Sequence, residues 1–209
     1  MAGHHRIFIA GISVHIFRRG HNLMDIFHHP SDYESFLVFV KYAATDYKID
    51  VHAYTLMTNH IHLVATPNDG LAIPDAMKEI GERYVRYYNR KYDRIGTLWC
   101  GRYRAKPIED EQYWLTCLRY VEQNPVRAKM VSTPDAYRWS SYSAHAFGSW
   151  PDWLTPHSVY LTLGRTNDER QLAYRNLCGA PLTEDELALV RCGPRRGVRL
   201  QSDLSQTSV

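Results

Sequence analysis

Two stretches of alternating hydrophobicity, separated by only two residues, constrain the fold of this chain most strongly. Apolar and polar side chains alternate through residues 49–57, and a second strand-like stretch covers residues 60–66. This period of two predicts strands, because successive side chains of a strand point to opposite faces. Thr58 and Asn59, which separate the two stretches, have the composition of a tight turn. The sequence therefore predicts an antiparallel hairpin.

Further periodic segments surround this hairpin. We expect strands at 6–18 and 98–108 and helices at 31–47, 73–91 and 110–124. Ser31 with Glu34 has the spacing of a capping box for the first helix, and Pro125 is expected to stop the last one. The first six elements match the split βαβ pattern, so the expected fold class is α+β, with a ferredoxin-like antiparallel sheet and helices on one face.

The composition changes after about residue 131. Prolines and tryptophans occur there in short segments, a helix is expected at 168–178, and Thr183 with Glu186 caps a further short helix. We therefore predict a domain at residues 1–130 and a small, mostly helical accessory segment at residues 131–209. The end of that segment, after Cys192, is expected to be poorly ordered.

Basic and aromatic residues concentrate between Lys78 and Lys106. That stretch holds nine basic and three acidic residues, six more positive than negative charges, whereas the whole chain has a net charge of +3. Cations that contact phosphates, interleaved with rings that stack on bases, are typical of a groove for single-stranded nucleic acid. A solvated basic helix whose tyrosines face the core explains the same composition, so both interpretations stay open.

The chain lacks the patterns of a membrane or secreted protein. No stretch free of charges is long enough to span a bilayer, and residues 1–11 lack the pattern of a secretory signal. The four cysteines have neither zinc-site spacing nor the density of a disulfide scaffold, and we interpret them as reduced packing residues. We expect a cytoplasmic protein.

His60 and His62 are the first candidate site. Residues two apart on a strand share a face, so both imidazoles are expected to point the same way, with Ile61 and Leu63 in the core. Two neutral imidazoles side by side can hold one divalent metal ion. The pair alone is weak support, because ordinary exposed strand residues would give the same pattern.

Tyr120 and Asn124 are the second candidate site. They lie four residues apart on the helix expected at 110–124 and so share one face. The Asn124 carbonyl oxygen suits Mg²⁺ or Mn²⁺ as a third ligand. The Tyr120 phenol could attack a metal-bound phosphate and become linked to it. Tyr113 lies on the same face, seven residues earlier, but it lacks the neighbouring asparagine.

Five blocks of sequence, in order, resemble the single-tyrosine HUH transposases and their REP-associated tyrosine transposase branch. They cover roughly residues 6–178 and include the family's histidine-hydrophobic-histidine signature and its nucleophile helix, in which a polar ligand and then Pro-Val follow the tyrosine. The blocks are Arg19-Gly20-His21-Asn22, residues 57–63 (Met-Thr-Asn-His-Ile-His-Leu), residues 96–103, Arg119 to Ala128, and Trp139-Ser140-Ser141-Tyr142.

The resemblance implies a function and roles for individual residues. Members of the family cleave single-stranded DNA near hairpins, through a 5′-phosphotyrosine intermediate that leaves a free 3′-hydroxyl. Residues 1–130 would be the catalytic domain, with Tyr120 as nucleophile and with His60, His62 and Asn124 as ligands of Mg²⁺ or Mn²⁺. The partner would be a hairpin of palindromic repeat DNA, bound by a nucleoid-associated monomer or homodimer. The candidate DNA contacts are Arg18, Arg19, Asn22, Arg83, Arg86, Arg90, Trp99, Arg102 and Arg104.

Two positions depart from the family pattern and leave alternatives open. Cys100 stands where the family has an acidic residue, and Thr58 replaces a proline before Asn59. A domesticated protein that binds repeat hairpins but cuts poorly is therefore a second interpretation. A small-molecule hydrolase that uses the two histidines is a third, but it explains neither Tyr120 nor the basic aromatic stretch.

Overall fold

The computed structural model describes residues 7–192 of the chain. Its first half contains four strands and two long helices, with a third helix following the last strand. In chain order these elements are β1 (Ser13–Arg19), η1 (His21–Leu23), α1 (Pro30–Asp46), β2 (Ile49–Met57), β3 (His60–Pro67), α2 (Ala72–Lys91), β4 (Arg104–Ile108) and α3 (Glu111–Glu122).

Short helices make up most of the second half. They are α4 (Asn124–Arg127), η2 (Pro134–Ala136), α5 (Tyr142–Phe147), α6 (Ser158–Leu161), α7 (Asn167–Gly179) and α8 (Glu184–Cys192). The capping box expected at Thr183 and Glu186 is confirmed, because each residue's side chain accepts from the other's main-chain N–H. The boundary at residue 130 stays a prediction, and the tail after Cys192, expected to be poorly ordered, lies outside the described residues.

The four strands form one antiparallel sheet in the order β2-β3-β1-β4. This is the strand order of the ferredoxin-like split βαβ unit, so the expected fold class is confirmed. The hairpin predicted from the alternation pairs Met57 with His60 at its turn and Ile49 with Pro67 at its far end. The centre of the sheet is therefore formed by β3 and β1.

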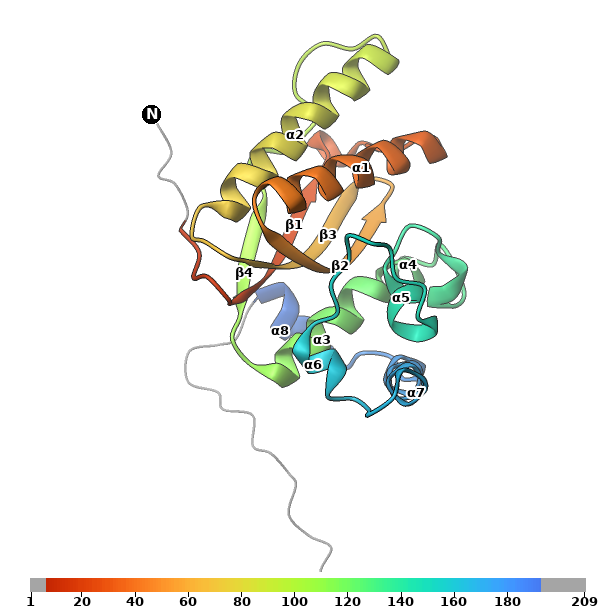
Figure 1. Cartoon of the computed structure of the whole chain (residues 1–209). Coiled ribbons are helices and arrows are strands. Elements are labelled where there is room, and N and C mark those ends of the chain that lie inside the picture. The colour runs from red at the N-terminus through yellow and green to blue at the C-terminus, as the bar shows by residue number, and fades with distance from the viewer. Residues whose placement is uncertain (1–6, 193–209) are drawn as a thin grey trace, which may run out of the picture.

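Helices cover both faces of the sheet. Figure 1 shows α1 and α2 on one face and α3, with α6 and α8, on the other. Ile16, Ile61 and Leu63 point toward α1 and α2 and belong to the larger core cluster. Val64 and Trp114 belong to a second cluster, which α3 shares with the helices after residue 140. The expectation of helices on one face holds for the split βαβ unit, and α3 adds a layer on the other.

Four local expectations were wrong in detail. The first strand starts at Ser13, and β4 starts at Arg104, because Gly96 and Gly101 adopt positive φ and the segment before β4 turns. The capping box of α1 is formed by His29 and Asp32 instead of Ser31 and Glu34. Pro125 does not end a continuous helix, since α3 stops at Glu122 and Pro125 lies in the first turn of α4.

None of the helices between residues 7 and 192 is long and apolar enough to cross a membrane.

Candidate active site on the α3 face of the sheet

The two histidines of β3 lie on the face of the sheet that α3 covers. Their ring centroids are 5.2 Å apart, and Ile61 between them points into the opposite core. The shared face predicted from the alternation is therefore observed. His62 is only 3% exposed, so the alternative of ordinary exposed strand residues does not describe it.

Tyr120 reaches this pair from α3. Its ring meets the ring of His62 edge-on, with centroids 5.6 Å apart and planes at 84°. The Thr55 hydroxyl of β2 donates to the Val121 main-chain oxygen at 2.8 Å, and this bond connects the end of α3 to the sheet. Tyr113 and Tyr120 both belong to the second core cluster, but of the two tyrosines it is Tyr120 whose ring contacts His62. The structure therefore brings His62 and Tyr120 together, as the candidate site requires.

The side-chain amide of Asn124 is buried at the start of α4, which packs against β2. Its Nδ2 has no hydrogen-bond partner among the described residues. Rotating the amide by 180° would place its carbonyl oxygen at this unpaired position. A buried, unsatisfied amide fits a side chain that awaits a ligand such as a cation.

The tautomer of His60 follows from its neighbour. Asn59 donates from Nδ2 to the Leu23 main-chain oxygen at 3.1 Å, which turns its Oδ1 toward Nδ1 of His60 at 2.6 Å. An amide oxygen only accepts, so Nδ1 of His60 donates and Nε2 keeps its lone pair. Burial, followed by the charges of Arg127 and Arg19, lowers the pKa of His60 to about 4. His60 is therefore neutral near pH 7, the form that binds metals.

Within the described residues, no three His, Cys, Asp or Glu side chains are grouped to hold a metal ion. A metal site built on His60 and His62 would therefore need a third ligand of another kind, and an asparagine oxygen is a ligand type that Mg²⁺ and Ca²⁺ accept.

The sequence did not single out His15 and Arg127, which also belong to this site. Nε2 of His15 lies 2.9 Å from Nδ1 of His62. The guanidinium of Arg127 lies over the Tyr120 ring, with Cζ 4.0 Å from its centroid. Their signals in the sequence were weak: His15 is one of the alternating residues of the first expected strand, and Arg127 is the second-last residue of the block that resembles the nucleophile helix.

Comparison with known proteins identifies the family. The model of the family described as IS200-like transposases matches residues 9–124, more than half of the chain. The chain belongs to the IS200-like transposase family. A solved REP-associated tyrosine transposase, described as bound to a REP hairpin, is similar in fold, with a TM-score of 0.60 and 17% identity. That match covers 76% of this chain and 96% of the solved one.

Other solved structures are less similar. A putative transposase from Deinococcus radiodurans R1 has a TM-score of 0.40 and 16% identity, and it covers 50% of this chain and 85% of its own. A bacterial tRNA(His) guanylyltransferase-like protein in complex with GTP has a TM-score of 0.46 and 12% identity, and it covers 71% of this chain and 72% of its own. No curated protein matches this chain.

A cavity of about 230 Å³ opens beside the candidate nucleophile of this transposase. His62, Tyr120 and Arg104 line it, and the last turn of α8 forms another part of its wall. The Lys106 ammonium donates to the Val190 main-chain oxygen at 3.0 Å, and it also donates to the main-chain oxygen of Arg191. These bonds attach the carboxyl end of α8 to β4 at the site.

The other candidate DNA contacts are spread over the transposase. Arg19 is exposed and pairs with His60 in the β1–β3 register, whereas Arg18 points to the opposite face and stacks on Trp99, which is itself buried. Arg83 is held by Glu79 at 2.5 Å. Exposed positions on α2, η1 and the segment before β4 carry the remaining candidates, Asn22, Arg86, Arg90 and Arg102. Among all the arginines that the sequence offered as candidate DNA contacts, only Arg104 lines the cavity beside Tyr120.

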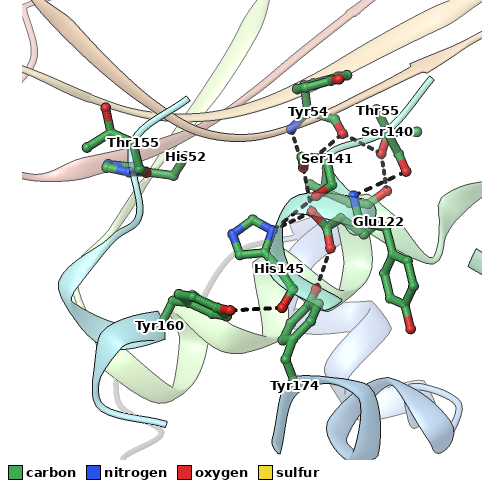
Figure 2. Close-up of polar contacts among 12 residues, drawn as sticks. His52, Tyr54, Thr55, Glu122, Ser140, Ser141, His145, Thr155, Tyr160 and Tyr174 are labelled. Carbon is green, nitrogen blue, oxygen red and sulfur yellow. Dashed lines mark hydrogen bonds and ion pairs between the residues drawn. The ribbon is translucent and has the colours of Figure 1, made fainter. Parts of the chain in front are cut away.

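A buried polar cluster surrounds Glu122, two residues after Tyr120 in the sequence (Figure 2). Glu122 of α3 is 0% exposed. Its Oε1 accepts from Ser141 and from Nδ1 of His145 at 2.9 Å, and its Oε2 accepts from the Tyr174 hydroxyl at 2.6 Å. All three donors come from the segment after residue 130. The segment after residue 130 therefore supplies hydrogen-bond donors to the buried Glu122 carboxylate of α3, the helix that carries Tyr120.

Proposed function

We propose that this transposase is a metal-dependent single-stranded DNA endonuclease and strand transferase that acts through a 5′-phosphotyrosine intermediate. The observation that carries the proposal is the edge contact between Tyr120 and His62, with ring centroids 5.6 Å apart. It joins a phenol of α3 to the histidine pair of β3. A nucleophile beside two neutral imidazoles and a half-buried cation suits phosphoryl transfer.

Tyr120 supplies the attacking atom. Its hydroxyl oxygen bonds to the scissile phosphorus, the phenol proton passes to solvent, and the bond from phosphorus to the 3′ oxygen breaks. The 3′ oxygen takes up a proton and leaves as a free hydroxyl. One phosphodiester bond replaces another, so attack by a 3′-hydroxyl on the phosphotyrosine rejoins the strand.

The neighbouring side chains prepare the phosphate for this attack. His60, His62 and Asn124 would hold Mg²⁺ or Mn²⁺, which when bound polarises the phosphate and offsets its developing charge. Arg127 places a second positive charge against the Tyr120 ring. Arg104, at the rim of the cavity, is positioned to contact the DNA backbone.

The proposed substrate is a hairpin of palindromic repeat DNA. The similar solved transposase is described as bound to a REP hairpin. The Asn-Pro-Val ending of the nucleophile block also favours the REP-associated branch. The location that goes with this substrate is the cytoplasm, in association with the nucleoid, and the acting form is a monomer or a homodimer.

A hairpin-binding protein with little cleavage activity is the second candidate. Cys100 favours it, because this exposed cysteine stands where the family has an acidic residue and its main-chain N–H bonds to Arg19, the register partner of His60. An acidic side chain at this position could help to hold a cation or orient the DNA.

Trapping the covalent intermediate tests the proposal. A labelled single-stranded hairpin, taken from a repeat palindrome beside the gene, is incubated with the protein and Mg²⁺ or Mn²⁺, and label attached to protein is read on a denaturing gel. We expect a covalent band that Tyr120→Phe and His62→Ala abolish. Tyr113→Phe is the matched control and keeps the band. A tight gel shift without any covalent band would instead support the binding protein.

A further inference from the structure

A buried hydrogen bond joins His62 to a histidine on the neighbouring strand. Nε2 of His15 on β1 and Nδ1 of His62 on β3 are 2.9 Å apart, and the two rings are stacked, with centroids 5.1 Å apart and planes at 17°. Both side chains are buried, and the Tyr120 ring makes T-shaped contacts with both. A bond between two imidazoles needs an N–H on one ring and a lone pair on the other, so it determines where the protons lie.

The direction of this bond decides whether His62 can bind a metal ion. If Nδ1 of His62 donates, the neutral ring keeps a lone pair on Nε2 for the metal. If Nε2 of His15 donates instead, the proton of a neutral His62 lies on Nε2 and its other nitrogen is occupied by His15. Only the first arrangement leaves His62 a free ligand atom.

We propose that His15 is a positioning residue whose Nε2 accepts the Nδ1 proton of His62, which fixes the metal-binding tautomer of His62. The inference rests on the proposed function, in which His62 is a metal ligand. Metal-binding histidines usually donate their second ring N–H to an acceptor, which fixes the tautomer and the ring orientation. Here an imidazole takes the place of the more common carboxylate, carbonyl or water.

The neighbouring ligand supports this direction. The Asn59 amide, held in place by the Leu23 main-chain oxygen, makes Nδ1 of His60 the donor. With His15 as the acceptor for His62, both histidines of the pair carry the proton on Nδ1 and keep a lone pair on Nε2. The two strands that flank β3 at this end thus have matching roles: the β2–β3 turn orients His60, and β1 orients His62.

The tautomer of His62 can be measured without metal. Two-bond ¹H–¹⁵N correlation spectra of the full chain, labelled with ¹⁵N-histidine, distinguish a protonated Nδ1 from a protonated Nε2. We expect wild-type His62 to carry its proton on Nδ1. A wild-type spectrum with the proton on Nε2 overturns the proposal, and this result requires no variant to fold.

Two variants extend the test to metal binding. His15→Leu removes the acceptor, and we expect a shift of His62 toward the Nε2-protonated tautomer and Mn²⁺ affinity lowered about tenfold or more. His15→Gln keeps an acceptor oxygen and is expected to restore both. Affinity is measured by electron paramagnetic resonance of free Mn²⁺.

The outcomes separate this inference from the proposed function. Equal tautomers and equal Mn²⁺ affinities in wild type, His15→Leu and His15→Gln would overturn the role of His15, even if wild type cleaves DNA. A wild-type protein that shows the expected tautomer but binds no Mn²⁺ overturns the metal function, while it supports the hydrogen bond assigned to His15.

Discussion

The guanidinium of Arg127 lies over the Tyr120 ring, with Cζ 4.0 Å from the ring centroid, and Nη1 donates to the Tyr120 main-chain oxygen at 3.0 Å. The side chain is half-buried, and burial lowers its pKa below the usual range, yet it stays charged near pH 7. Under the proposed function, a fixed cation at this place would stabilise the charge that develops when the phenol attacks a phosphate.

Arg127→Ala is therefore expected to slow formation of the covalent adduct by about 10²–10³-fold, a typical effect of removing one charge-stabilising donor. Single-turnover rates with a labelled hairpin, at saturating DNA and Mg²⁺, measure the effect. Arg127→Lys should recover part of the rate, because the charge remains while the planar contact is lost.

Arg138→Ala is the matched control for this loss of charge. Arg138 also lies over an aromatic ring, that of Trp139, but its side chain is exposed and pairs with Glu34. Its removal should leave the adduct rate unchanged. Equal rates for Arg127→Ala and wild type would contradict the role of Arg127 at the nucleophile.

Glu122→Gln tests the buried cluster behind the nucleophile. The carboxylate accepts from Ser141, His145 and Tyr174, and a glutamine would turn its amide N–H groups toward one or more of these donors. We expect the free energy of unfolding to fall by about 2–4 kcal/mol, since a fully buried hydrogen-bonded charge is removed. Urea unfolding followed by circular dichroism measures it.

Glu184→Gln provides the comparison, because Glu184 lies at an exposed position of α8. A change within about 0.5 kcal/mol is expected there. If Glu122→Gln were equally mild, the packing of α5 and α7 beside α3 would not depend on the charge of Glu122.

The sheet and its hairpin could be predicted from the sequence because their signals are local. Alternation within β2 and β3, together with the Thr58-Asn59 turn, places His60 and His62 on one face without knowledge of any other element. The approach of Tyr120 to that face was not given by periodicity. It followed only from the resemblance to the family's nucleophile helix.

Contacts that depend on strand register and on distant partners could not be predicted in this way. His15 meets His62 because β1 pairs with β3 in one particular register, 47 residues apart in the chain. Glu122 finds its donors 19, 23 and 52 residues later. No local pattern marks such pairs, because the side chains are ordinary polar residues until the fold buries them together.

Stability should decrease under mildly acidic conditions, with His52 as one cause (Figure 2). Its Nδ1 donates to the Thr155 main-chain oxygen at 2.8 Å and its Nε2 lies 2.8 Å from the Thr66 hydroxyl, so the neutral ring is satisfied on both sides. Burial lowers the pKa of His52 to about 4, although the Thr155 bond raises it in part.

Histidine in the unfolded chain takes up a proton near pH 6.5, whereas folded His52 does so only near pH 4. Between these two pH values the unfolded state therefore binds more protons than the folded state. The free energy of unfolding therefore falls as the pH drops through this window, by up to about 1.4 kcal/mol per pH unit for each such group. His52→Gln should make the slope shallower in urea titrations at several pH values. His21→Gln, at an exposed position, should not, and an unchanged slope in His52→Gln would contradict the assignment.

The DNA backbone is expected to follow the α3 face of the sheet and not the basic stripe of α2. Arg104 lines the cavity beside Tyr120, whereas Arg86 lies on α2, on the other face. The slope of log affinity against log salt concentration is negative, and loss of one phosphate contact makes it shallower by about 0.7–0.9. Arg104→Ala should show this change and weaker hairpin binding in gel shifts over a series of salt concentrations, while Arg86→Ala should keep the wild-type slope. The reverse result would place the DNA backbone along α2, on the other face of the sheet.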